Sequence, residues 1–190
     1  MKYTQIPADT FTHLQMNAGI LLRDFDPATG SFEATDLIGA TSGGVNFTAT
    51  PEYSDFGEDV DNCPKNTMEL KKLTSVTAEM TGNLVTVDTA VAKSLVGAAD
   101  VSGNKITPRA DLATTDFEDL WLVSDYSEVN EGTNAGFVAI HMLNALSTGG
   151  FQLQTTDKGK GQFAFTYTAH YSISAQSTVP YEVYVKAGTV

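Results

Sequence analysis

The alternation of hydrophobic and polar positions is clearest near the C-terminus, in residues 163–173. One face carries Phe163, Phe165, Tyr167, Ala169, Tyr171 and Ile173, and the other carries Ala, Thr, His and Ser. A period of two over about 11 residues predicts a long strand with one buried side. Phe151, Leu153 and Thr155 alternate in the same way, and turn residues fill 156–161 between the two segments. Residues 148–173 are therefore predicted to form a β-hairpin.

A second, longer hairpin is predicted over residues 44–87. Its first strand begins with the alternating Val45, Phe47 and Ala49 and continues past Pro51 to Tyr53. A proline inside a strand indicates a sheet edge or a bulge. The return strand lies within Met68–Val87, and the polar segment Asp61–Thr67 between the strands predicts an exposed, charged tip that projects from the protein.

One helix is predicted, over residues 88–97. Asp88 can accept hydrogen bonds from the first turn as an N-cap, and Gly97 is a plausible stop. Val87, Val91 and Leu95 recur every four residues, which is typical of a helix face that packs on a core.

The rest of the chain predicts further strands. An early strand runs from about Phe11 to Asp24, where alternate positions are apolar. Leu120–Val123 and Phe137–Leu146 are apolar strands separated by an acidic loop, Asp125–Asn134, and a terminal strand alternates at Tyr181, Val183 and Val185. About eight strands with one short helix predict a mainly β fold. We expect two packed antiparallel sheets, sandwich-like or barrel-like, in a single domain over residues 1–190, with a flanking helix and the long projecting hairpin.

The charge of the chain argues against a protein that binds nucleic acid. Its formal net charge is −12, and 17 of its 23 acidic residues lie in two windows, 24–64 and 110–157, that contain no Lys or Arg. Proteins that bind nucleic acid carry basic clusters that displace counterions from phosphate. The acidity is explained either by solubility or by a surface that must pass DNA without holding it.

Candidate catalytic and ligand sites are few, and the pattern supports none. Cys63 is the only cysteine, which excludes an intrachain disulfide, and the three histidines fall on separate predicted strands. Residues 59–70 have Pro64 and Leu70 where a calcium-binding loop needs Gly and Glu. We expect no enzyme activity, cofactor or metal. The N-terminus lacks the apolar run of a secretion signal, and no stretch is long enough to span a membrane, so we expect a protein made in the cytoplasm that does not bind membranes.

Several long stretches, in order along nearly the whole chain, resemble major tail tube proteins of long-tailed, non-contractile bacteriophages of Gram-positive bacteria. They are Ile6–Gly30, Gly39–Leu73, Lys105–Leu112, Trp121 and His141–Ile173. The resemblance implies a structural virion protein that forms stacked six-membered rings. It also implies that the rings build a hollow tail tube around a tape-measure protein, with each subunit adding a hairpin to an inner barrel and a loop that contacts the next ring.

The resemblance further implies the partners and the place of assembly. The protein would contact other copies of itself, the tape-measure protein, and tail-tip and terminator proteins. Double-stranded DNA would pass transiently through an acidic lumen. The tube would be assembled in the host cytoplasm and end in the virion tail.

Carried onto this chain, the resemblance makes the 44–87 hairpin the candidate site. The acidic residues expected at the lumen or between rings are Glu52, Asp55, Glu58, Asp59 and Asp61. The expected stacking loop comprises Asn62, Pro64, Lys65, Asn66, Lys71 and Lys72. Opposite charges so close together suit contacts between identical rings, although salt bridges within one subunit explain them equally well.

Two alternatives remain open at this point. The inner tube of a contractile injection particle would differ only in its neighbouring sheath. A monomeric β-sandwich binding module, for example one that binds carbohydrate, would place aromatic residues on its surface, whereas the alternation here places them in the core.

Overall fold

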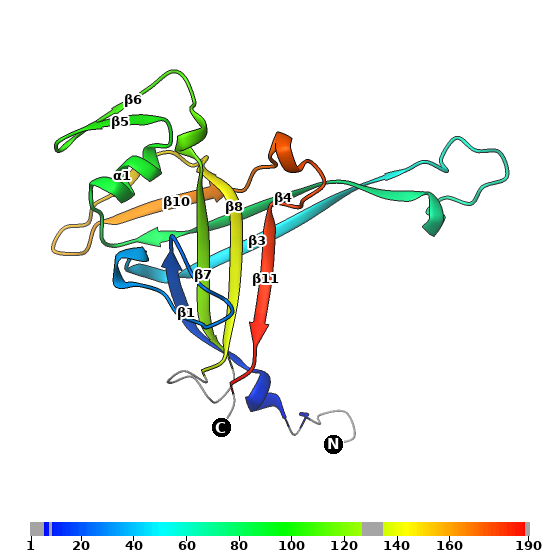
Figure 1. Cartoon of the computed structure of the whole chain (residues 1–190), viewed down its shortest axis with the longest axis horizontal. Helices are drawn as coiled ribbons and strands as arrows, with labels where there is room; N and C mark the ends of the chain where they lie inside the picture. Colours follow the sequence, from blue (N-terminus) through cyan, green and yellow to red (C-terminus); the bar gives the residue numbers. More distant parts are fainter. Residues whose placement is uncertain (1–5, 8, 127–134, 189–190) are drawn as a thin grey trace.

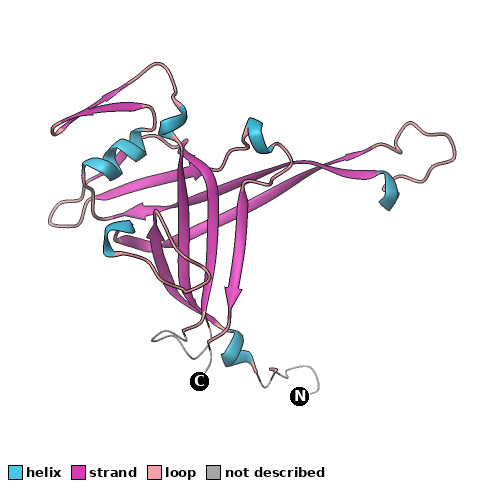
Figure 2. Cartoon of the chain, viewed as in Figure 1, coloured by secondary structure: helices cyan, strands magenta, loops and turns pink. Residues whose placement is uncertain are grey.

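The structure is a computed structural model, and it describes residues 6–7, 9–126 and 135–188. Within this part of the chain there are eleven strands and one α-helix, against the eight or so strands expected (Figure 2). The strands are β1 Gln15–Leu22, β2 Leu37–Gly39, β3 Thr41–Asp55, β4 Lys71–Leu84, β5 Ala99–Ser102, β6 Lys105–Pro108, β7 Glu118–Tyr126, β8 Phe137–Ser147, β9 Gln152–Gln154, β10 Gln162–Thr168 and β11 Tyr181–Lys186. Short 3-10 turns span Thr10–His13, Ala34–Asp36, Met68–Leu70, Thr114–Asp116 and Ile173–Ala175.

Antiparallel pairing joins nine strands into one sheet, in the order β2-β1-β7-β8-β10-β4-β3. Strand β11 pairs with β8, strand β9 pairs with β10, and β5 and β6 form a separate two-stranded sheet. In Figure 1 the strands β1, β7, β8 and β11 run across β10, β4 and β3. The mainly β, antiparallel fold with one helix is therefore confirmed, and its two layers are halves of one large sheet that meet where β8 pairs with β10.

The main core lies between these two layers. Strands β4 and β10 contribute Met80, Leu84, Phe165 and Tyr167, and β1, β7 and β8 supply the opposing side chains, including Leu122. The helix α1, Thr89–Val96, adds Val91 and Leu95, the two buried members of the predicted stripe. The Asp88 side chain accepts a hydrogen bond from the Val91 amide at 2.7 Å, and Gly97 ends the helix at a φ of 80°. The predicted helix is confirmed at both ends.

A second core covers the other face of the β1–β7–β8 layer. It consists of Leu22, Phe25, Trp121, Phe137 and Ala139. Strand β7 is buried on both faces, since Leu120 and Leu122 lie in the main core while Trp121 lies in the second one. Burial on both faces explains why this segment reads as a continuous apolar run instead of an alternation.

Strand β1 departs from the expected regular alternation. Its pairing with β7 shifts between Met16 and Ile20, where Asn17 and Gly19 have φ values of 66° and 73°. A Cβ on Gly19 would lie 2.7 Å from the Val123 carbonyl oxygen, so this bulge needs glycine. The strand also starts later than expected, at Gln15, because residues 10–13 form a 3-10 turn.

The predicted strand 163–173 is also too long. Strand β10 ends at Thr168, and Ile173 begins a 3-10 turn with its side chain 89% exposed. Near the end of this segment, the Tyr171 hydroxyl accepts a hydrogen bond from the Val76 amide at 2.9 Å. The Val76 amide therefore bonds to a side-chain oxygen, where a longer β10 would have offered it a backbone carbonyl. The hairpin with β9 is confirmed, with Leu153 opposite Phe163.

Three further expectations differ in part from the structure. Strand β11 is confirmed, but Val183 and Val185 are exposed. The turn at Ser102–Asn104 is flanked by the short strands β5 and β6, which the sequence pattern did not indicate. Most of the expected acidic loop Asp125–Asn134 lies outside the described residues, and its first residue belongs to β7.

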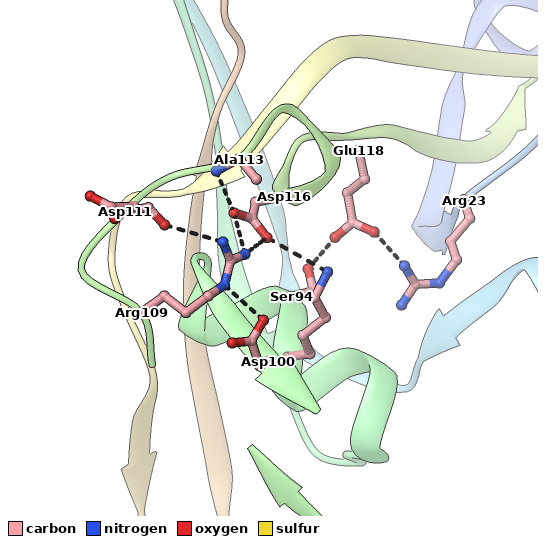
Figure 3. Close-up of polar contacts among 9 residues, drawn as sticks. Arg23, Ser94, Asp100, Arg109, Asp111, Ala113, Asp116 and Glu118 are labelled. Atoms are coloured by element: carbon pink, nitrogen blue, oxygen red, sulfur yellow. Dashed lines mark hydrogen bonds and ion pairs between the residues drawn. The ribbon is translucent and has the colours of Figure 1, made fainter. Parts of the chain in front are cut away.

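A buried ionic cluster attaches β6 and α1 to the main body (Figure 3). Arg109 Nη2 donates to both carboxylate oxygens of Asp116, at 2.6 and 2.7 Å, and its Nε lies 2.9 Å from Asp100. The hydrogen bond from the Ala113 amide, together with Arg109, holds the pKa of Asp116 below its ordinary value. The charge of Asp116 is thus compensated although its side chain is buried.

Glu118 continues the cluster toward the core. Its carboxylate accepts hydrogen bonds from Arg23 of the loop after β1 and from Ser94 of α1. The Ser94 hydroxyl also lies 2.6 Å from the hydroxyl of Tyr167, and burial raises the pKa of Tyr167 to about 12. The cluster therefore connects the helix to both layers of the sheet.

Candidate interaction surface

The most distinctive surface lies at the end of the β3–β4 hairpin. The two strands pair from Thr41 opposite Leu84 to Asp55 opposite Lys71, with an irregularity between Glu52 and Tyr53. Beyond this point the hairpin extends away from the other strands (Figure 1). We refer to residues 53–73 as the arm. Strand β3 is an edge strand, and its register with β4 shifts between Glu52 and Tyr53, just after Pro51. The sheet edge and the bulge that this proline indicated are therefore both present.

The tip of the arm is closed by Asp55. Its carboxylate accepts hydrogen bonds from the backbone amides of Gly57 and Asn66, each at 2.9 Å. These two bonds are the main reason that the pKa of Asp55 lies below its ordinary value, and Lys71 and Lys65 lower it further. Asn66 has a φ of 61°, a conformation that Asn tolerates better than most residues. The tip is therefore a defined loop, fixed by side-chain to backbone bonds.

Large apolar side chains are exposed along the arm. They are Tyr53, Phe56, Val60, Met68 and Leu73. Met68 is 79% exposed and Phe56 is 60% exposed, although each belongs to a residue type that is usually buried. Lys71 and Lys72 lie over the rings of Tyr53 and Phe56, each with Nζ 5.5 Å from the ring centroid. The arm thus presents an apolar surface bordered by cations.

The five predicted acidic residues differ in their surroundings. Asp55 is used to close the tip, and Glu52 accepts a hydrogen bond from the Ser75 hydroxyl at 2.7 Å at the base of the arm. Glu58 lies 3.6 Å from Lys65, and both side chains are exposed. Asp59 and Asp61 are exposed on the loop. Within one subunit, the salt-bridge alternative therefore holds for the Glu58–Lys65 pair.

The predicted stacking residues fall into two groups. Asn62, Pro64, Lys65 and Asn66 are exposed on the loop, as expected. Lys71 and Lys72 instead begin β4, opposite Asp55 and Ser54. Sequence reasoning missed the exposed apolar side chains of the arm. Phe56, Val60 and Met68 lie at irregular spacing among polar residues, so no periodic pattern marks them.

Two of the hollows on the surface have largely apolar linings. A pocket of about 620 Å³ is lined mainly by apolar residues, including Ile20, Phe25 and Phe137. At its polar side Asn17 donates a hydrogen bond to Asp125, so this carboxylate has a partner. A groove of about 380 Å³ lies at the base of the arm, between Tyr53 and Leu73 on one side and Val183 on the other. The groove extends the apolar surface of the arm onto the body.

The prediction that the three histidines lie on separate strands holds only for His141, because His13 ends a 3-10 turn and His170 follows the end of β10. His141 of β8 stacks on Trp121 with ring centroids 3.9 Å apart, and its two ring nitrogens lie 3.3 and 3.5 Å from Asp119 and Glu182. In residues 6–7, 9–126 and 135–188, no group of three or more His, Cys, Asp or Glu side chains is placed to hold a metal ion. The same residues contain no helix that is long and apolar enough to cross a membrane.

Comparison with known proteins gives distant likenesses. No protein-family profile matches the chain, and no curated protein matches it. The chain is similar to a solved structure of the tail of an empty gene transfer agent particle with C6 symmetry, at 11% identity and a TM-score of 0.43, over 83% of this chain and 96% of the other. It is also similar to a chain in the virion of a native gene transfer agent particle, at 11% identity and a TM-score of 0.43, over 90% and 99%. Likenesses this distant do not assign the chain a family or a function.

Proposed function

We propose that the protein is the structural subunit of a phage tail tube. Copies of it form rings, and the rings stack into a hollow tube around a tape-measure protein. The tube is capped by terminator and tail-tip proteins, belongs to the virion tail and conducts DNA during ejection. The single observation that carries the proposal is the arm, a two-stranded extension that exposes large apolar side chains away from the body.

An arm of this kind is incomplete without a partner. An isolated two-stranded hairpin is marginally stable in water, and contiguous exposed apolar residues mark interaction sites. Tyr53, Phe56 and Met68 would be buried if the arm lay against another copy of the chain. An arm that reaches one way from each subunit makes a head-to-tail contact, which generates stacks instead of closed dimers.

The body offers a way to form the rings. Strands β9, β10, β4 and β3 form a four-stranded unit whose outer members, β9 and β3, each pair on one side only among the described strands. Unpaired strand edges are templates for pairing with another chain. Placing β3 of one copy beside β9 of the next would join these units into a closed barrel and remove both edges.

The dimensions of such a barrel suit a DNA channel. The resemblance implies six subunits per ring, and with four strands from each, at ~4.8 Å per strand, the circumference is ~115 Å and the backbone diameter ~37 Å. Strand tilt widens the barrel further. The opening that remains inside the side chains is wider than a DNA duplex.

The charged residues of the arm fit the contact between rings. The exposed Glu58, Asp59 and Asp61 lie on the same projecting loop as Lys65, and Lys71 and Lys72 follow at the start of β4. Mixed charges around an apolar centre give orientation and selectivity to a contact between identical surfaces. We place these residues at the stacking interface.

The test separates ring formation from stacking. In an arm-shortened variant, residues 57–69 are replaced by Asn-Gly, a two-residue turn that suits a β-hairpin between Phe56 and Leu70, which already share a hydrogen bond at 3.0 Å. The purified wild-type protein and the variant are concentrated and imaged by negative-stain electron microscopy. We expect tubes from the wild type and single rings from the variant. Tubes from the variant would contradict the role of the arm.

A further inference from the structure

We infer that the wall of the channel is a surface of hydroxyl and amide groups, with Glu52 and Glu79 as its charged side chains in each subunit. The inference rests on the proposed function and identifies the surface along which DNA slides. It differs in part from the acidic lumen that the sequence suggested, because only Glu52 of the five acids predicted there lies on this wall, and the other four lie on the arm.

Cross-strand register defines this surface. Thr48, Glu79 and Thr168 lie side by side on β3, β4 and β10, and so do Asn46, Thr81 and Thr166 in the next row. A third row continues to β9 through Asn83, Ala164 and Gln152. We call the set the polar face: Asn46, Thr48, Thr50, Glu52, Ser75, Thr77, Glu79, Thr81, Asn83, Gln152, Gln154, Gln162, Ala164, Thr166 and Thr168.

The opposite side of the same strands is the core. The rows between those of the polar face contain Phe47, Met80 and Tyr167, and the body of the protein packs against them. Side chains alternate between the two faces of a strand, so the two surfaces are separated along all three long strands. The polar face is one side of this sheet. The remaining strands and α1 pack against the other side.

This asymmetry decides which face points inward. When β3 and β9 edges join the four-stranded units into a ring, one face of the barrel points to the hole and the other points outward. The body strands and α1 occupy the core side, and the hole has no room for them. The polar face must therefore line the channel.

The chemistry of the polar face suits a surface that releases DNA. None of its fifteen positions is Lys or Arg, and none is aromatic. Proteins that hold nucleic acid use basic residues to neutralise phosphate and aromatic rings to stack on bases. Some of its polar groups also pair among themselves, as the Asn46 side-chain amide donates a hydrogen bond to the Thr48 hydroxyl at 3.2 Å. The wall neither attracts phosphate nor offers a base-stacking platform, and Glu52 and Glu79 add repulsion.

Cysteine labelling of assembled tubes tests the placement. Thr48 on the polar face and Thr107 on β6 are both exposed threonines, so Thr48→Cys and Thr107→Cys form a matched pair in a Cys63→Ser background. Tubes are treated with biotin-maleimide, washed and exposed to streptavidin, which is too large to enter the channel. We expect streptavidin to bind intact Thr107→Cys tubes and not intact Thr48→Cys tubes. After the tubes are dissociated, subunits of the two variants should bind streptavidin equally.

Two results would overturn the inference, and they are distinguishable. Streptavidin bound along the sides of intact Thr48→Cys tubes would place the polar face on the outside. That result would contradict the inference about the channel wall and leave the proposed function as a tube subunit intact. Failure of the wild-type protein to form tubes under any condition would remove the proposed function and the wall together.

Discussion

The backbone amide of Asn66 donates a hydrogen bond to the carboxylate of Asp55 at 2.9 Å, and this bond closes the loop at the tip of the arm. The two residues are 11 positions apart along the chain. The shape of the loop that we place between rings therefore depends on one acidic residue, whose carboxylate also accepts a bond from Gly57.

The first prediction concerns Asp55→Ala. Removing the carboxylate leaves the amides of residues 57 and 66 without their acceptor, so the loop should lose its fixed conformation while the body stays folded. Amide hydrogen exchange should accelerate in residues 56–67 and stay unchanged in β7 and β8. Asp59→Ala, an exposed acid on the same loop, is the control and should leave exchange unchanged. Equal protection in both variants would contradict the role of Asp55.

The same carboxylate gives the loop a pH dependence. The pKa of Asp55 in the folded arm lies below its ordinary value of 3.8. Its contribution is therefore fully present above pH 3.8 and is lost as the pH falls through the lower, folded value. The protection of the loop amides, measured relative to their intrinsic exchange rate at each pH, should fall in acid before the body unfolds, and in Asp55→Ala this step should be absent.

The second prediction concerns the cations at the start of β4. Lys71→Glu combined with Lys72→Glu should impair stacking more than folding. The two cation–π contacts contribute only about 0.5–1 kcal/mol each at an exposed site, whereas charge reversal places repulsion within the ring contact. Denaturant unfolding and electron microscopy measure the two effects. Lys105→Glu combined with Lys158→Glu reverses two lysines outside the arm, one at the start of β6 and one in the turn between β9 and β10, and should stack normally. Normal tubes from the first variant would show that these lysines are not at the interface.

The third prediction concerns the buried cluster in Figure 3. Asp116→Ala should lower the unfolding midpoint by more than about 5 °C, because Arg109 then loses its buried partner. The lowered pKa of Asp116 means that its contribution is lost only in acid, as the pH falls through the folded value. Asp111→Ala removes an exposed carboxylate nearby and should leave the midpoint unchanged. Calorimetry that gave equal midpoints for the two variants would contradict the anchoring role.

The fourth prediction concerns the channel wall. Glu79→Lys would place a cation from every subunit on the polar face, so the tubes should retain short duplex DNA at low salt and release it as salt rises. Asp111→Lys makes the same charge change on an exposed loop outside the sheet. We expect DNA to sediment with Glu79→Lys tubes and to stay in solution with Asp111→Lys and wild-type tubes. Equal retention by the two variants would argue against a wall position for Glu79.

Much of the fold could be predicted because local patterns and tertiary structure agree. Asp88 and Gly97 end the helix as their side-chain and backbone preferences dictate, and the alternation in 44–87 gives the long hairpin. Where tertiary contacts compete, the pattern fails. The Tyr171 hydroxyl takes a backbone donor near the end of β10, and the bulge at Gly19 breaks the alternation of β1.

The candidate site was predicted less completely, and the reason is physical. Composition shows that residues 52–61 are acidic, but only the fold shows that Asp55 is used inside the loop. Alternation shows which residues share a face, but an exposed apolar face and a buried one look the same in sequence. This is why the predicted strand face at Val183 and Val185 proved to be exposed. The apolar arm was missed for another reason, because its apolar residues follow no regular spacing.

The most direct test of the central claim is electron cryomicroscopy of tubes assembled from the purified protein, with helical reconstruction. The account predicts rings in which β3 of one subunit lies beside β9 of its neighbour, with Glu79 toward the hole and the arm against the next ring. A tube with the arms free on its outer wall, or a persistent monomer with no assembly at any concentration, would contradict it.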